Sequence, residues 1–233
     1  MRVAALCDVH GNLHALEAVL AELQGEEADA IVFGGDLAAG PLPAETLERI
    51  ESLREQALFV RGNADREPGD WVASRLDERQ LRFLADLPET QELEVDDLGR
   101  TLFCHGSPRS DSEILTAVTT EERLREILAG VGPRVVVCGH THHQFDRVVD
   151  GVRVVNAGSV GMAYEGRPGA YWALLGPDVE LRRTEFDFEA AAEAFRTSGF
   201  PDGAEHAETL YRNPPSAREV AEYFERQALG AAS

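Results

Sequence analysis

The first half of the chain alternates short apolar runs with stretches in which leucines recur at helical spacing. Apolar runs at residues 2–7, 30–33 and 57–60 each have the length of a buried strand. Between them, residues 13–24 and 44–54 place apolar side chains on one face of a helix. Strands that alternate with helices predict crossover connections, and therefore a parallel sheet.

The second half of the chain predicts more antiparallel strand. Asp150 and Gly151 lie between apolar runs at residues 145–149 and 152–155, which is a strong hairpin signal. The other predicted strands are 92–95, 100–103, 135–138, 170–175 and 179–184, and the other predicted helices are 76–87, 119–128, 189–196 and 216–228. Residues 66–74 resemble a loop or a broken helix, and residues 199–215 resemble a loop.

No repeat, linker or low-complexity segment divides these elements. A chain of 233 residues suffices for one large domain or two small ones. We therefore predict a single domain over residues 1–233, in which residues 199–233 form an appended C-terminal loop and helix.

Composition narrows the class of protein. The formal net charge is −20, and all 22 basic residues are arginine, which excludes lysine-based Schiff-base and P-loop chemistry. An acidic body repels phosphate backbones, so tight binding to nucleic acid or to an anionic membrane is not expected. No apolar run approaches the roughly 20 residues of a membrane span, and Asp8 interrupts the N-terminal apolar run, unlike in a signal peptide. We expect a cytoplasmic protein, and a homo-oligomer remains possible.

Residues 135–142 carry the first chemical signal. The apolar run ends at Gly139, and two histidines follow, His140 and His142. Because side chains alternate along an extended segment, an extended loop would point both imidazoles into the same space. By the same alternation His143 would face solvent. A histidine pair at a strand end suits a transition metal.

Four other apolar runs also end in residues that bind metals. Because the carboxyl ends of parallel strands meet at one edge of a sheet, ligand sites gather there. The candidate ligands at the five strand ends are Asp8, His10, Asp36, Asn63, His105, His140 and His142. Mixed oxygen and imidazole donors suit manganese, iron, zinc or nickel better than calcium. Seven ligands are too many for one ion but fit two ions that share a carboxylate.

The motifs at these strand ends resemble those of the calcineurin-like metallophosphoesterases. They are Asp8-Val-His10, Gly35-Asp36, Gly62-Asn63-Ala64-Asp65, His105-Gly106 and Gly139-His140-Thr-His142, in the order found in that family. The resemblance extends from Asp8 to about Gly161, and Asp8-Val-His-Gly-Asn12 is similar to the small bacterial phosphodiesterase branch. Five ordered motifs are far more specific than any one of them.

The resemblance implies a fold and a chemistry. The fold would be a four-layer α/β/β/α sandwich of two mixed sheets flanked by helices. Asp8, His10, Asp36 and His142 would hold one ion and Asp36, Asn63, His105 and His140 the other, with Asp36 bridging; the ions would be two divalent transition metals, foremost Mn²⁺. Two cations about 3.5–4 Å apart activate a bridging hydroxide for in-line attack on phosphorus. The implied substrate is a small phosphoester or a nucleotide.

One position departs from the family pattern. Many members have a histidine after the asparagine, where it assists the leaving group, but this chain has Ala64. His14, one helical turn after His10, is a candidate general acid, although an ordinary helix histidine is the commoner case. Asp65 is expected to support a ligand histidine. Asn12, Arg109 and Tyr164 are candidate substrate contacts, since they lie near the motifs.

Three functions fit this pattern. The first is a dinuclear phosphodiesterase. The second is a phosphomonoesterase or nucleotide polyphosphate hydrolase that uses the same site. The third is a protein-binding scaffold without catalysis, which all seven retained ligands disfavour.

Overall fold

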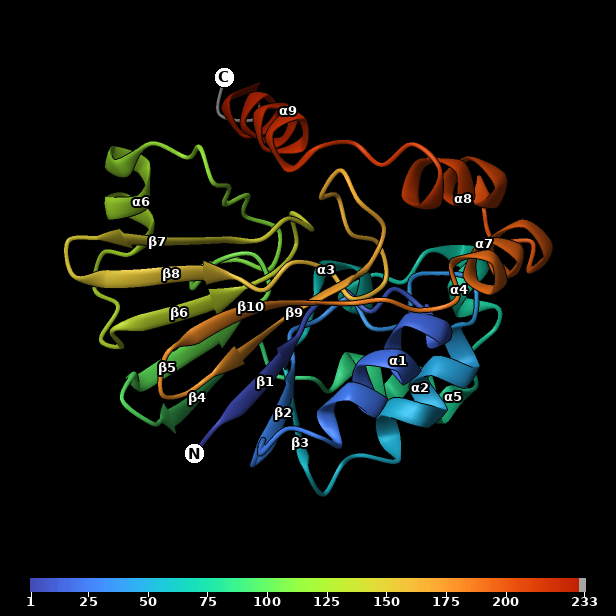
Figure 1. The fold of residues 1–233 in the computed structure, drawn as a ribbon, viewed down its shortest axis with the longest axis horizontal. Helices are drawn as coiled ribbons and strands as arrows, with labels where there is room; N and C mark the ends of the chain where they lie inside the picture. The colour runs from blue at the N-terminus through green and yellow to red at the C-terminus, as the bar shows by residue number, and fades with distance from the viewer. Residues whose placement is uncertain (231–233) are drawn as a thin grey trace.

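Two five-stranded sheets lie face to face in the computed structural model, which describes residues 1–230 (Figure 1). The first sheet has the order β10-β9-β1-β2-β3. Its strands are β1 (Val3–Leu6), β2 (Ala30–Phe33), β3 (Ala57–Phe59), β9 (Ala170–Leu175) and β10 (Val179–Thr184). β1, β2 and β3 are parallel, as the alternation of strands and helices predicts, while β9 and β10 are antiparallel to their neighbours.

The second sheet has the order β4-β5-β6-β8-β7. Its strands are β4 (Thr90–Val95), β5 (Gly99–Cys104), β6 (Val135–Cys138), β7 (Phe145–Val149) and β8 (Val152–Asn156). The predicted hairpins β4–β5 and β7–β8 both form. β5, β6 and β8 run parallel at the centre, so the sheet is mixed.

Helices cover the outer faces of both sheets. The helices of the described chain are α1 (Leu13–Leu23), α2 (Pro43–Glu51), α3 (Asn63–Arg66), α4 (Asp70–Ala73), α5 (Glu78–Ala85), α6 (Glu121–Ile127), α7 (Phe188–Thr197), α8 (Gly203–Tyr211) and α9 (Ala217–Gly230). Between the sheets, Val3 and Val32 pack in one cluster with Val135 and Val155. The four-layer α/β/β/α prediction is therefore confirmed.

Strand alternation explains why these strands are apolar throughout. In β1, Val3 and Ala5 enter the core between the sheets, whereas Ala4 and Leu6 pack in the core beneath α1 and α2. A strand buried on both faces has no polar face, so it appears in the sequence as a continuous apolar run. Side chains that could bind a ligand are consequently confined to the strand ends.

The C-terminal segment differs from its prediction. Residues 199–215 were expected to form a loop, but they contain α8, which buries Gly203, Ala207 and Leu210. Ala207 and Leu210 pack with Phe195 of α7 and with Met162. Figure 1 shows α8 and α9 along one edge of the molecule, near the loop that joins β8 to β9. Residues 66–74, predicted as a loop or a broken helix, contain the end of α3 and the short helix α4.

Candidate metal centre

The predicted ligands lie just after β1, β2, β3, β5 and β6, on loops except for Asn63, which begins α3. The structure brings five of them, Asp8, His10, Asp36, His105 and His142, into two groups that could each hold a cation. One group is Asp8, His10 and His142, and the other is Asp8, Asp36 and His105. The shared carboxylate of these two groups is Asp8.

The two carboxylates lie between the histidines. Asp8 Oδ1 is 3.1 Å from His142 Nε2, 3.7 Å from His10 Nε2 and 3.9 Å from His105 Nε2. Asp36 Oδ2 is 3.4 Å from His105 Nε2 and 3.7 Å from His10 Nε2. Asp36 thus lies between a histidine of each group, which is compatible with the bridging role that the resemblance implies.

Backbone carbonyls orient three of the histidines. The Nδ1 atoms of His10, His105 and His142 lie 2.9, 2.8 and 2.8 Å from the carbonyl oxygens of Ala39, Gly34 and Met162. A neutral imidazole that donates from Nδ1 has a lone pair at Nε2. His10 Nε2 and His142 Nε2 are 3.0 Å apart, so in this tautomer two acceptors face each other without a proton between them. A cation that both nitrogens bind would remove this conflict.

Several buried polar atoms at the site have no hydrogen-bond partner. Within residues 1–230, five buried side-chain atoms lack one, and three of them are Asp8 Oδ1, Asn63 Oδ1 and His105 Nε2. A buried acceptor without a partner is costly, and such atoms commonly indicate a missing ion. All three belong to predicted ligands, so the residues present fit a metal centre.

The backbone is strained at five of the seven predicted ligands. Positive φ angles of 55°, 49°, 54°, 67° and 57° occur at Asp8, His10, Asp36, His140 and His142. Left-handed backbone is unfavourable for residues with a β-carbon, and it clusters at functional sites. The other positive-φ residues besides glycine in the described chain are all aspartates: Asp97, Asp150 and Asp202.

The electrostatics of the cluster favour cations. Burial raises the pKa of Asp8, but His142 and His105 outweigh it and hold the pKa well below the usual range. Burial also opposes ionisation of Asp36, yet His105 and His10 lower its pKa to about 2. Burial lowers the pKa of His105, whereas Asp36 and Asp8 raise it to about 10. The two buried, ionised carboxylates give the cluster negative charge that a bound cation would balance.

His140 and Asn63 lie beside these groups. The ring of His140 is 5.2 Å from that of His105, and its backbone N–H donates to Asp8 Oδ2 at 2.9 Å. Burial and the charge on His105 lower the pKa of His140 to about 4, so it is neutral at pH 7 and able to bind a metal. The assignment of Asn63 and His140 to a second ion remains a prediction.

Asp65 supports the site differently from its prediction. Its carboxylate accepts hydrogen bonds from the backbone N–H groups of Asp36, Leu37 and Gly62, at 2.8–2.9 Å. No histidine of the described chain donates a hydrogen bond to it. Burial and the charge of Asp36 raise the pKa of Asp65 to about 7, while the N–H groups of Gly62 and Leu37 oppose this shift. Asp65 therefore holds the backbone that carries Asp36.

The candidate substrate contacts have different environments. Asn12 is buried, caps α1 by accepting from the N–H of Ala15, and donates to Gly161 O and to the Tyr211 hydroxyl. Both the oxygen and the nitrogen of its amide thus make hydrogen bonds within the protein, which favours a structural role. The Arg109 guanidinium pairs with Glu113 and with the carbonyl of Glu126 rather than with a predicted ligand. By contrast, the Tyr164 ring stacks on that of His142, with centroids 5.2 Å apart and planes at 19°.

The loop after β6 is not extended, which corrects two expectations. Positive φ angles at His140 and His142 break the strand alternation. Both side chains still turn toward the site, but the reason is the left-handed backbone. His143 was expected to face solvent, yet it is completely buried, and its Nε2 accepts from the N–H of Ala117 at 3.3 Å. Alternation holds only for extended backbone, so it failed here.

The C-terminal helix α8 approaches the same centre, which the sequence motifs did not indicate. The Tyr211 hydroxyl lies 2.8 Å from Asn12 Nδ2. Burial lowers the pKa of His206, and the nearby charge of His10 lowers it further. In the sequence, the helical spacing of Gly203, Ala207 and Leu210 is the feature that could have predicted α8.

Comparison with known proteins agrees with this geometry. The family model for the calcineurin-like phosphoesterase superfamily domain matches residues 1–176. Phosphodiesterase YfcE of Escherichia coli K12 is 28% identical over 188 residues, which cover 77% of this chain and 89% of YfcE. Uncharacterized protein MJ0912 of Methanocaldococcus jannaschii is 25% identical over 86% of this chain and 94% of its own length.

A solved structure extends the comparison to the fold. The crystal structure of a metallophosphoesterase from Sphaerobacter thermophilus is 25% identical and superposes with a TM-score of 0.71, covering 89% of this chain and 98% of that one. The match of the family model covers well over half of the chain, and the candidate metal groups lie within it. The chain therefore belongs to the calcineurin-like phosphoesterase superfamily.

Proposed function

We propose that this chain is a dinuclear metal-dependent phosphoesterase that prefers phosphodiesters. The observation that carries the proposal is the convergence of unpaired acceptors at the strand ends: Asp8 Oδ1, Asn63 Oδ1 and His105 Nε2, with the facing Nε2 atoms of His10 and His142. When bound, two cations would supply an activated water nucleophile and neutralise charge on the phosphoryl oxygens. We propose Mn²⁺ first, with iron, zinc or nickel as alternatives that suit the same donors.

The residues of the chain would prepare this reaction by holding charge in place. Asp8 and Asp36 are ionised and almost fully buried, so they would hold the cations where little water competes. Asn63 contributes a neutral oxygen, which limits the negative charge that an anionic substrate meets. The N–H of Ala64 donates to Asp36 Oδ1 at 2.8 Å and fixes that carboxylate. Preorganised groups of this kind act without reorganising during the reaction.

The proton for the leaving group would have to come from a residue other than Ala64. Ala64 offers no proton, and His14 remains the candidate, half-buried in the first turn of α1. Its imidazole makes no hydrogen bond or ion pair with the rest of residues 1–230. Without a strong acid, esters with good leaving groups should react fastest, because their oxygen departs without a proton.

A pair of chromogenic esters tests the diester preference. We expect the Mn²⁺-loaded protein to hydrolyse bis-p-nitrophenyl phosphate with a higher kcat/KM than p-nitrophenyl phosphate. Both substrates release p-nitrophenolate, so the comparison isolates the second ester group. A strong preference for the monoester would instead support a phosphomonoesterase or nucleotide polyphosphate hydrolase at the same centre.

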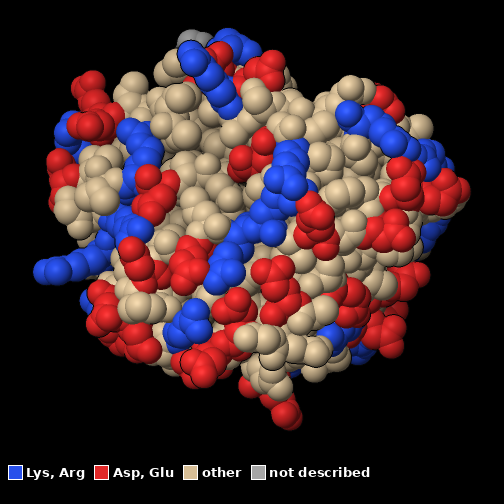
Figure 2. Space-filling model, viewed as in Figure 1, with Lys and Arg blue, Asp and Glu red and all other residues tan. Residues whose placement is uncertain are grey.

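The surface suits a small substrate better than a polyanion. On the face shown in Figure 2, arginines lie among acidic side chains. Several of them form ion pairs, such as Arg153 with Asp146 and Asp178. Within the described part of the chain, no helix is both long and apolar enough to cross a bilayer. A small phosphoester, rather than a nucleic acid or a membrane, is the partner that we propose, together with a cytoplasmic location.

A further inference from the structure

A cavity between α8 and α9 lies next to the metal centre, and the proposed function does not use it. Its volume is about 530 Å³, and its apolar wall includes Tyr164, Val220, Tyr223 and Phe224. Pockets for small molecules commonly measure about 300–1,000 Å³ and have such walls. We call this cavity the C-terminal pocket.

One residue, Tyr164, connects the C-terminal pocket with the metal ligands. Tyr164, which lines the pocket, also stacks on the ring of His142. A neighbouring cavity of about 290 Å³ shares Tyr164, Glu205 and Thr209 with it and also includes His206. A phosphoester at the metals could therefore place one ester group in the C-terminal pocket.

The two helices that form the pocket are anchored to the body. Tyr211 of α8 lies in hydrogen-bond contact with Asn12, at 2.8 Å. The N–H of Gly166 donates to Pro215 O, between the two helices, at 2.8 Å. Glu225 of α9 accepts from Thr116 at 2.8 Å. The pocket is thus a fixed part of the fold, and its helices lie beyond residue 176, where the family match ends.

The polar groups of the pocket define the chemistry that it would bind. The Glu219 carboxylate is used by Ser216, which donates to it at 2.6 Å. Glu205 is exposed and makes no hydrogen bond or ion pair anywhere in the described chain, so its oxygens are free acceptors. Aromatic walls with a free anionic acceptor suit a flat ring that carries N–H donors. An alkyl group would leave Glu205 unused.

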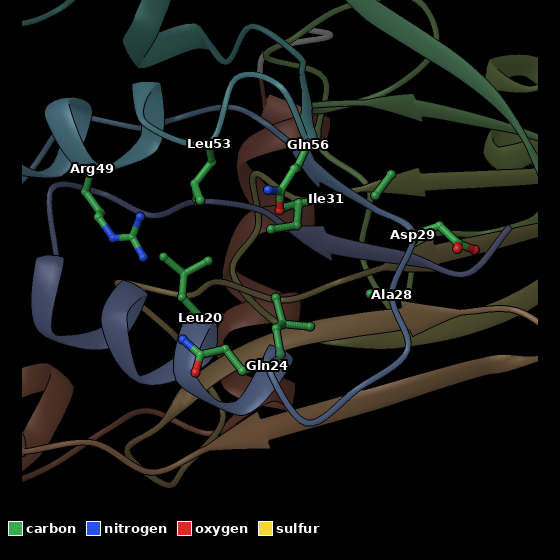
Figure 3. Close-up of a pocket in the computed structure, with 10 residues that line it drawn as sticks. Leu20, Gln24, Ala28, Asp29, Ile31, Arg49, Leu53 and Gln56 are labelled. Atoms are coloured by element: carbon green, nitrogen blue, oxygen red, sulfur yellow. The ribbon is translucent and has the colours of Figure 1, made fainter.

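A second cavity has no comparable link to the metal ligands. Figure 3 shows it between α1, α2 and β2, with a volume of about 240 Å³. Its lining includes Asp29 and Ile31 at the start of β2, at the end of the strand opposite to Asp36. Its arginine, Arg49, already pairs with Glu17 at 2.8 Å.

We propose that the C-terminal pocket binds one ester group of the substrate, a flat, amino-bearing heteroaromatic ring such as a nucleobase. The ring would stack against Tyr164, Tyr223 and Phe224 and donate a hydrogen bond to Glu205. This inference rests on the proposed function, because it places the phosphoryl group at the metal centre. It predicts a nucleoside phosphodiester as the substrate class.

Binding of two matched phosphates tests this inference. Calorimetry on the Mn²⁺-loaded protein would compare cytidine 5′-monophosphate with ribose 5-phosphate, which has the sugar phosphate but no base, while phosphate release is monitored in the same samples. Because base stacking on aromatic side chains is strong, we expect the cytidine compound to bind at least about tenfold more tightly. Tyr223→Ala and Glu205→Gln should each reduce this ratio toward unity.

Two variants on the outer face of α9 serve as controls. Leu229 is 65% exposed, and Glu222 pairs with Arg218. Neither lines the pocket, so Leu229→Ala and Glu222→Gln should keep the wild-type ratio. Equal affinity of the wild type for both ligands would overturn the inference. It would also be overturned if the control variants lowered the affinity ratio as much as Tyr223→Ala and Glu205→Gln do. Failure of the proposed function would appear separately, as no hydrolysis of bis-p-nitrophenyl phosphate.

Discussion

Asp36→Asn is expected to lower kcat/KM for bis-p-nitrophenyl phosphate by more than about 100-fold. Even partners of metal ligands typically cost about 10–100-fold when replaced, and Asp36 is itself a candidate ligand. The substitution keeps the shape of the side chain and an oxygen that can accept from Ala64 N–H, but removes the charge between His105 and His10. Steady-state kinetics with saturating Mn²⁺ measure the effect.

An exposed aspartate provides the matched control. Asp86 lies at the end of α5 and makes no side-chain hydrogen bond with the rest of the described chain. Asp86→Asn should retain full activity, and circular dichroism should show both variants folded. An Asp36→Asn protein that is folded and fully active would show that Asp36 is not part of the catalytic site.

Gly62→Ala is expected to disrupt the metal centre and the fold around it together. A β-carbon at Gly62 would lie 2.1 Å from Asp36 Oδ1 and 2.4 Å from Asp36 N. The second atom is backbone, so the clash cannot be relieved by a rotamer change. We expect a free energy of unfolding lower by about 1–3 kcal/mol, the usual range for overpacking. Loss of bound Mn²⁺ should accompany it, because Asp36 must move.

A nearby glycine separates this effect from the general cost of replacing glycine. At Gly69 a β-carbon would meet no atom within 4 Å. Gly69→Ala should therefore keep the metal content and the denaturant midpoint of the wild type. If Gly62→Ala binds Mn²⁺ as tightly as Gly69→Ala, the close approach of backbone and carboxylate is unimportant for the centre.

The strand ends of the sheet were predictable from the sequence because burial on both faces leaves a clear pattern. Within β1, β2 and β5 the side chains are largely apolar. Asp8, Asp36 and His105, which follow these strands, are therefore easy to recognise in the sequence. Parallel pairing then places these ends at one edge. Five residues brought together in the structure follow from this reasoning.

The conformation of the loops could not be predicted in the same way. Left-handed backbone at His140 and His142 depends on contacts from distant segments, such as the hydrogen bond from His140 N–H to Asp8. The backbone carbonyls that orient the histidines cannot be predicted from the sequence either, because every residue has a carbonyl. The burial of His143 follows from this irregular loop.

The helix α8 was missed for a different reason. Pro201, Pro214 and Pro215 flank it, and its buried positions Gly203 and Ala207 have little or no side chain. Small residues give a weak apolar stripe, even though they allow close packing against Phe195. The segment nevertheless contacts Asn12 through Tyr211, and it is the part of the chain on which the inferred substrate class depends.

Metal analysis of purified wild type and His140→Ala tests the central claim most directly. Each protein would be dialysed against Mn²⁺, desalted, and measured for metal per chain by mass spectrometry. We predict two ions per wild-type chain, and in His140→Ala one empty site with the other partly filled, since His140 is assigned to one ion only. Two ions at full occupancy in His140→Ala, or none in the wild type, would contradict the two-metal assignment.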